Sequence, residues 1–80
     1  MLIDYIQAAL RHAHYDRLAD DGSFYGEIPE LPGVWSNADT LEETREELQE
    51  VLEDWIVLGL ARGIPIPTID GVEIAIPRPA

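Results

Sequence analysis

The feature that most constrains this chain is the stretch of residues 20–43, in which turn-forming residues alternate with short apolar segments. Asp21-Gly22 predicts a tight hairpin turn, because glycine tolerates the positive φ angle that such a turn requires. The aromatic and β-branched run 24–28 predicts the strand that follows this turn. A hairpin needs two strands, so residues 13–19 are expected to form the first, although they carry no clean alternation.

A second turn follows the predicted strand. Pro29 ends the strand, or restricts it to a sheet edge, because proline has no backbone N–H. Pro32-Gly33 has the order of residues that is typical of a type II turn. The short run 34–37 then predicts a further strand, so the strands are expected to lie within residues 13–37.

Residues 40–62 predict one long helix. Thr40 and Glu43 have the spacing of a capping box, in which the two side chains satisfy free N–H groups at the helix start. Asp39 and Glu42 have the same spacing one residue earlier. Gly63 suits the C-terminal cap, and Pro65 prevents the helix from continuing.

This predicted helix is amphipathic. Its apolar face, in which Thr44 fills a gap, consists of Leu41, Leu48, Val51, Leu52, Trp55, Ile56 and Leu60. Acidic residues lie mostly on the other side: Glu42, Glu43, Glu46, Glu47, Glu50, Glu53 and Asp54. We therefore expect the helix to cover a sheet with its apolar face, with Trp55 in the core.

The two ends of the chain complete a single domain, residues 1–80. Residues 1–12 predict a short N-terminal helix from about Ile3 to His12. Its apolar stripe is expected to be Leu2, Ile3, Ile6, Ala9, Leu10 and Ala13. So short a helix is marginal alone, and it should pack on the sheet or on another subunit. Near the other end, Asp70-Gly71 predicts a turn, and the alternation at 72–76 predicts a last strand.

The ordered set of motifs resembles the HicB-type antitoxin domain over roughly residues 13–67. The residues that carry the resemblance are Asp21, Gly22, Tyr25, Glu27, Pro29, Leu31, Pro32, Gly33, Asp39, Thr40, Leu41 and Glu43. The resemblance implies an α+β fold, a small partial ribonuclease-H-like β-β-β-α-β domain with one long helix across the sheet. The short N-terminal helix departs from that pattern, and we expect a stand-alone domain without the C-terminal DNA-binding domain that full-length family members usually carry.

The charge of the chain limits what it is expected to bind. The formal net charge is -11 over 80 residues, which disfavours binding to a phosphate backbone and favours a basic partner. There is no cysteine, so disulfides and thiolate zinc sites are excluded.

The apolar run 55–61 is far shorter than a membrane span, and the N-terminus does not resemble a signal peptide. We therefore expect a soluble, cytoplasmic protein without a cofactor or a bound metal.

Two groups of residues are candidates for partner binding. The first is the acidic helix side, which is either a solvated surface or a docking surface for a basic protein: Glu43, Glu46, Glu47, Glu50 and Asp54. The second is the aromatic pair Tyr25 and Trp35 on the short strands. Each of these is either part of the core or an anchor inside an interface.

Two other groups of residues have simpler explanations than a metal site. Asp16, Asp20 and Asp21 could in principle bind the metal ions of a nuclease, but turn formation and solvation explain them more simply. His12 and His14 have a spacing that would place both on one face of a strand, yet they form an incomplete ligand set. We expect them to be surface or interface histidines, and we expect no catalytic residues.

The sequence thus predicts a HicB-like antitoxin-type binding protein and not an enzyme. The resemblance implies a partner of the HicA type, a small basic RNA-cleaving toxin that the antitoxin sequesters. The alternative is a stand-alone oligomeric domain without a toxin partner, and a metal-dependent nuclease is a third possibility. A small sheet with one helix leaves an edge or a face uncovered, so a homodimer or a higher symmetric oligomer is expected.

Overall fold

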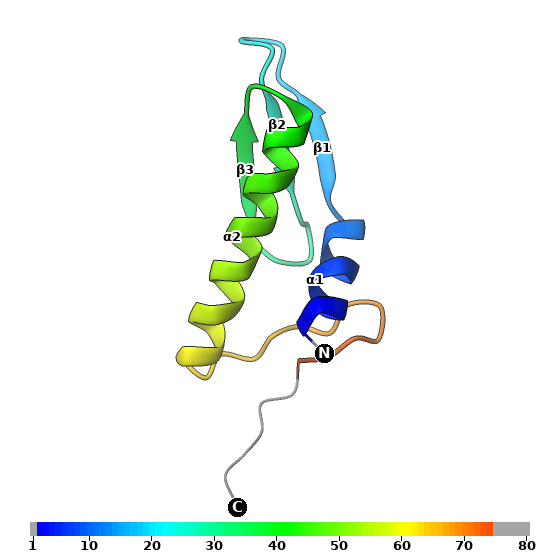
Figure 1. Ribbon diagram of the computed structural model, residues 1–80, viewed down its shortest axis with the longest axis vertical. Coiled ribbons are helices and arrows are strands. Elements are labelled where there is room, and N and C mark those ends of the chain that lie inside the picture. The colour runs from blue at the N-terminus through cyan, green and yellow to red at the C-terminus, as the bar shows by residue number, and fades with distance from the viewer. Residues whose placement is uncertain (1, 75–80) are drawn as a thin grey trace, which may run out of the picture.

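The computed structural model describes residues 2–74 and confirms the small α+β fold. Its elements are α1 (Leu2–Arg11), β1 (His14–Arg17), β2 (Phe24–Glu27), β3 (Trp35–Ala38) and α2 (Leu41–Ala61). The three strands form one antiparallel sheet in the order β1-β2-β3. The helix α2 lies across one face of this sheet, and α1 lies at the lower end of the sheet, below β1 (Figure 1).

Both turns of the sheet form where the sequence predicts them. The Asp21 carboxylate accepts hydrogen bonds from the Ser23 N–H at 2.9 Å and the Ser23 hydroxyl at 2.7 Å, while Gly22 takes a φ of 72°. In the second turn, the Val34 N–H donates to the Leu31 carbonyl oxygen at 3.0 Å, and Gly33 has a φ of 94°. A glycine with positive φ after proline is the signature of a type II turn.

Both ends of α2 are capped by local sequence. Thr40 is the N-cap, and its hydroxyl oxygen accepts the Glu43 N–H at 3.1 Å, so the structure selects this capping box over the one a residue earlier. At the other end, Gly63 has a φ of 69°, and the Ile64 N–H donates to the Gly59 carbonyl oxygen at 2.8 Å. This is a Schellman motif, which explains why the helix ends one residue from the predicted boundary.

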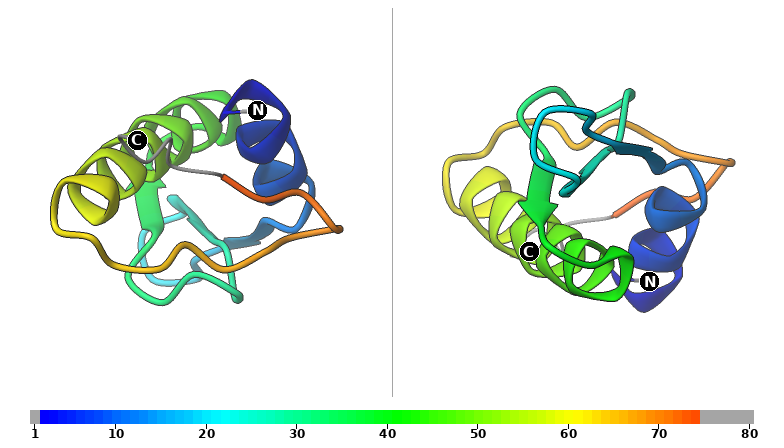
Figure 2. Two further views of the ribbon diagram at one scale, coloured as in Figure 1. Left: turned by 90° about the horizontal axis from the view of Figure 1, so that it is seen from below. Right: turned by 90° about the horizontal axis from the view of Figure 1, so that it is seen from above.

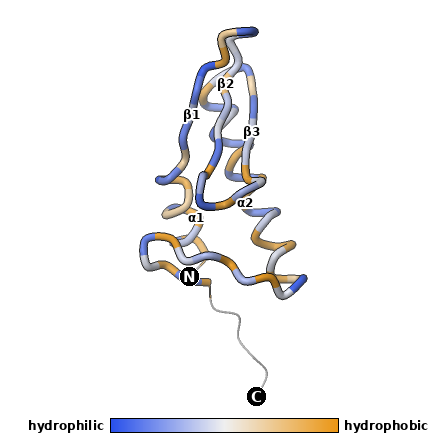
Figure 3. Tube along the Cα trace, turned by 180° about the vertical axis from the view of Figure 1, so that it is seen from behind, coloured by the Kyte–Doolittle hydropathy of each residue, from blue (hydrophilic) through white to orange (hydrophobic). Residues whose placement is uncertain are grey.

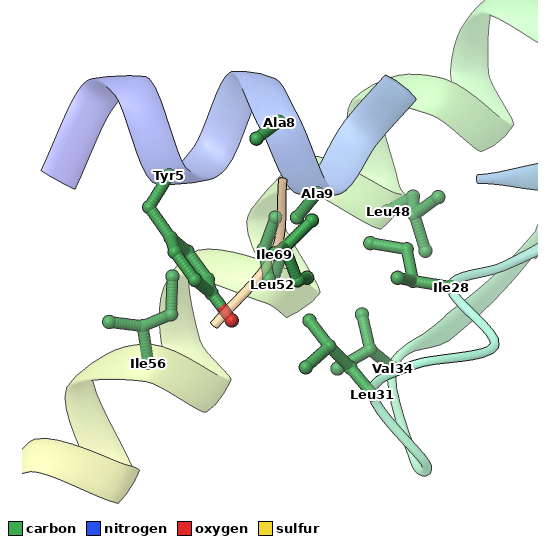
Figure 4. Close-up of a cluster of buried hydrophobic side chains, with 10 residues drawn as sticks. All are labelled: Tyr5, Ala8, Ala9, Ile28, Leu31, Val34, Leu48, Leu52, Ile56 and Ile69. Carbon is green, nitrogen blue, oxygen red and sulfur yellow. The ribbon is translucent and has the colours of Figure 1, made fainter. Parts of the chain in front are cut away.

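The core forms between α2, α1 and the loop that joins β2 to β3 (Figure 4). Its buried hydrophobic side chains are Tyr5, Ala8, Ala9, Ile28, Leu31, Val34, Leu48, Leu52, Ile56 and Ile69. Trp55, predicted to lie in the core, is only partly buried and packs against the edge of this cluster. Leu41, predicted on the apolar face, is 38% exposed in the first turn of α2.

The apolar stripe predicted for α1 is partly wrong. Leu2 and Ile3 are exposed, whereas Tyr5, Ala8 and Ala9 face the core. The Tyr5 hydroxyl also donates a hydrogen bond to the Pro67 carbonyl oxygen at 2.6 Å. This side chain is large and needs a polar partner, and it sets the rotation of α1.

The segment of residues 62–74, here called the strap, crosses the end of the molecule from α2 to α1 (Figure 2). Asp70 and Gly71 have φ angles of 51° and 75°, as in a type I′ turn, and they join Ile69 to Val72 in an isolated antiparallel bridge. The predicted last strand, 72–76, extends past the described residues. Within them, Val72 pairs with Ile69 and not with the sheet.

A substitution on β2 tests the tight contact between sheet and helix. A Cβ atom at Gly26 would lie 2.8 Å from Tyr15 Cε1 and 3.2 Å from Thr44 Cγ2. We expect Gly26→Val to lower the free energy of unfolding by roughly 1–3 kcal/mol, because overpacking forces neighbours to move. Glu27→Val places the same side chain on the exposed side of the same strand and should stay within about 0.5 kcal/mol of wild type. Equal stability of the two variants in urea denaturation would contradict this packing.

Candidate protein-binding surface

The contact of α2 with the sheet determines which strand residues face outward. The Ser36 hydroxyl donates to the Thr44 carbonyl oxygen at 2.8 Å, and the Thr44 hydroxyl lies 3.3 Å from the Phe24 carbonyl oxygen. Ser36 therefore points at the helix. Because side chains alternate along a strand, Tyr25 and Trp35 point to the opposite side of the sheet.

Figure 3 shows this opposite side of the sheet facing the viewer, and none of the described elements covers it. The rings of Tyr25 and Trp35 stack with their centroids 6.0 Å apart and their planes at 22°. Trp35 is 53% exposed, so the structure places it on the surface and not in the core. Stacked aromatic rings stabilise each other's position, so the two side chains form one exposed aromatic pair.

Two carboxylates lie next to the aromatic pair on the neighbouring strands. Glu27 lies directly across the strand pair from Trp35, and the Tyr25 hydroxyl donates to its Oε2 at 3.3 Å. Asp16 lies across from Tyr25 on β1. Desolvation raises the pKa of the Tyr25 hydroxyl, and the Glu27 charge raises it further. We call Asp16, Tyr25, Glu27 and Trp35 the aromatic face.

The predicted acidic residues form a second surface. Exposed carboxylates at helical spacing lie on the side of α2 that points away from the sheet: Glu43, Glu46, Glu47, Glu50 and Asp54. We call these five residues the acidic helix face. Since the buried side of α2 lies on the inner side of the sheet, the acidic helix face and the aromatic face are on opposite sides of the molecule. The structure thus brings Tyr25 and Trp35 together but separates them from the acids.

A three-residue cluster that the sequence analysis missed joins distant segments. His12, just after α1, contacts Glu30 in the loop between β2 and β3 through Nδ1, and Asp70 in the strap through Nε2 at 2.8 Å. Glu30 and Asp70 lie 18 and 58 positions from His12, so no local pattern could have indicated the contact. The expectation that His12 and His14 share a strand face is wrong, because His12 precedes β1.

The alternative metal site receives no geometric support among the described residues. Asp16, Asp20 and Asp21 are exposed, and Asp21 is engaged by Ser23 in the hairpin turn. Within residues 2–74, no group of three or more histidine or acidic side chains has an arrangement that could hold a metal ion. In the His12 cluster, the carboxylates of Glu30 and Asp70 contact the ring nitrogens directly. Neither α1 nor α2 is both long enough and apolar enough to cross a membrane.

A family model described as UPF0150-like matches residues 4–67. The chain belongs to the UPF0150-like family. The UPF0150 protein ssl0259 of Synechocystis sp. (strain ATCC 27184 / PCC 6803 / Kazusa) is 38% identical over 55 residues, which cover 69% of this chain and 74% of that protein. The crystal structure of TTHA0281 from Thermus thermophilus is 40% identical, with a TM-score of 0.89 over 96% of this chain and 95% of that one. Both the aromatic face and the acidic helix face lie inside the region that the UPF0150-like model matches.

The His12 cluster is expected to depend on pH. The hydrogen bonds to Asp70 and then to Glu30 raise the pKa of His12, because they favour the charged ring. The pKa of Glu30 is lowered by a hydrogen bond from its own backbone N–H and, less strongly, by His12. In this UPF0150-like protein, Asp70 lies outside the matched region, whereas His12 and Glu30 lie within it.

These shifts fix the sign of the effect on stability. The contribution of His12 to the free energy of unfolding is complete below its ordinary pKa of 6.5. It is lost as the pH rises through the raised pKa of His12 in the folded protein. The contribution of Glu30 to the free energy of unfolding is present above its ordinary pKa of 4.5. It is lost as the pH falls through the lowered pKa of Glu30 in the folded protein. We therefore expect the free energy of unfolding of wild type to decrease between about pH 6 and pH 8 by more than that of His12→Gln. Parallel curves for wild type and His12→Gln would show that the cluster does not contribute.

Proposed function

We propose that this UPF0150-like protein is a HicB-like antitoxin-type protein that sequesters a small basic RNA-cleaving toxin by protein–protein contact. The observation that carries the proposal is the exposed Tyr25–Trp35 stack on an open sheet face of a chain with net charge -11. Exposed aromatic side chains are enriched in protein interfaces, and negative charge selects a basic partner. The resemblance of the hairpin and helix motifs to HicB-type domains supports the choice of a toxin as that partner. The protein acts by blocking its partner and not by catalysis.

The two surfaces have different parts in this proposal. The aromatic face is the docking surface, because a rigid tryptophan can fill a pocket and exclude water from the contact. The acidic helix face, on the other side, contributes a long-range field that attracts a basic protein before contact. A single flat partner cannot contact both surfaces, so substitutions on each should affect different kinetic constants.

Binding kinetics can separate the two effects. The measurement is association with the basic protein from a neighbouring reading frame, at two salt concentrations. Trp35→Ala should speed dissociation and cost on the order of 2 kcal/mol or more in affinity, because it removes a central anchor. The double variant Glu46→Lys with Glu50→Lys should slow association at low salt and leave the dissociation rate nearly unchanged, because charges outside the contact act mainly on the encounter. The effect should be smaller near physiological ionic strength, where the Debye length is only about 8 Å.

The controls decide between the two surfaces. Leu18→Ala removes an exposed apolar side chain just after β1, at a position outside both faces, and it should leave both rates unchanged. An association rate that is insensitive to salt and to the double reversal would remove the acidic helix face from the mechanism. If the neighbouring protein does not bind at all, the antitoxin proposal fails.

A specific observation favours a second candidate, a self-associating domain without a toxin partner. Large apolar side chains are exposed at the start of α1 and the end of α2: Leu2, Ile3, Val57 and Leu58. We propose that the protein forms a homodimer or a higher symmetric oligomer, through the exposed side of α1 or through an edge strand of the sheet.

Mass measurements test this assembly. Light scattering at tens of micromolar should give at least a dimer mass. Ile3→Gln should lower that mass if α1 forms the contact, and because Ile3 is 70% exposed it should not disturb the fold. Ala8→Gln would be unsuitable, since Ala8 is buried in the core. A dimer that survives Ile3→Gln assigns the contact to an edge strand, and a monomeric wild type excludes the assembly.

A further inference from the structure

We propose that the Trp35 indole on the aromatic face is a receptor for an arginine side chain of a basic protein partner. Glu27 supplies the carboxylate for the guanidinium group, and Tyr25 holds the indole in place. The class of partner rests on the proposed function, whereas the chemistry of the site rests on the side chains of this chain.

The position of Trp35 leaves one side of its ring available. Tyr25 stacks on the side that faces β2, with planes at 22°. The strand β3 is an edge of the sheet, so the described residues place no strand on the far side of Trp35. An exposure of 53% agrees with an indole that is covered on one side only. A flat group can therefore stack on the open side without any rearrangement of the sheet.

The surrounding charges select a cation. A cation over a tryptophan ring is attracted by the negative face of the π system, and arginine takes this position more often than lysine. The Glu27 and Asp16 carboxylates are exposed beside the aromatic pair, across the strands from Trp35 and Tyr25. An arginine can stack its planar guanidinium on the indole and donate two parallel hydrogen bonds to one carboxylate, which the compact ammonium of lysine cannot do.

The same charges argue against other occupants. A nucleic-acid base could stack on Trp35, but its phosphates would then lie close to the carboxylates of Asp16 and Glu27. A second copy of this chain would bring carboxylates against carboxylates if the aromatic face met itself. An apolar patch would bury these carboxylates without partners, which is costly. His14 lies across from Glu27 on the same side, so the test is made at one fixed pH.

The experiment titrates the full-length protein with a hexa-arginine peptide, and with hexalysine and hexaglutamate for comparison. The indole N–H resonances of the two tryptophans are followed by NMR, and affinities are measured by calorimetry in low salt. The Trp35 signal should shift on addition of hexa-arginine, while Trp55, which packs at the edge of the core on α2, serves as an internal reference. Hexa-arginine should bind more tightly than hexalysine, and hexaglutamate should not bind.

Matched variants separate the site from general attraction to an acidic protein. Trp35→Leu should weaken hexa-arginine binding about two- to five-fold, as expected for an exposed cation–π contact. Glu27→Gln should weaken it to a similar extent. Glu50→Gln makes the same change of charge on the acidic helix face and should have a smaller effect. Both Trp35 and Glu27 are exposed, so the variants should remain folded, which urea denaturation can verify.

Several results would overturn the site. These are an unmoved Trp35 signal, equal affinities for hexa-arginine and hexalysine, equal effects of Glu27→Gln and Glu50→Gln, or a Trp35 signal that shifts with oligothymidylate. A Trp35 signal that changes with protein concentration, together with a dimer mass that Trp35→Leu abolishes, would assign the face to a second copy. The two proposals can fail separately. If the neighbouring basic protein does not bind, the toxin partner is excluded. If the peptide titration still shows the expected variant effects, the arginine site remains supported.

Discussion

The contact between Thr44 and the sheet is the interaction on which the rest of the structure depends. Thr44 is fully buried, its hydroxyl donates to the Thr40 carbonyl oxygen at 2.8 Å, and its own carbonyl oxygen accepts the Ser36 hydroxyl at 2.8 Å. Directional hydrogen bonds at this one turn hold α2 in a fixed register over β2 and β3. Gly26, the small residue beneath the turn, allows the close approach. A slip of one residue in β3 would move Trp35 to the helix side and Ser36 to solvent, so this contact also determines the aromatic face.

The elements that could be predicted from the sequence are those whose causes are local. The hairpin at Asp21-Gly22, the turn at Pro32-Gly33 and the cap at Thr40 each depend on residues within a few positions, and all three form as predicted. The rotation of α1 could not be predicted in this way. It depends on the hydrogen bond from Tyr5 to Pro67, which lies 62 positions away and becomes visible only when the strap crosses the end of the molecule.

The same distinction applies to the candidate site. Composition could make Tyr25 and Trp35, or the acids of α2, candidates for binding a partner, but it could not place the two groups on opposite sides of the sheet. Four-residue strands contain too few alternations to reveal which side is buried. The usable signal was the pair of small residues Gly26 and Ser36, which mark the side where a helix can approach closely.

The arrangement separates the part of the molecule that maintains the fold from the surface that we propose binds a partner. Most of the core lies between α1, α2 and the loop that joins β2 to β3, and His12 links this loop to the strap through Glu30 and Asp70. The aromatic face contributes little to this core, because Trp35 remains half exposed and its stacking partner Tyr25 lies on the same outer side. Residues with few buried contacts can change without a large loss of stability. The residues of the aromatic face can therefore change while the core and the turns, which determine its position, stay the same.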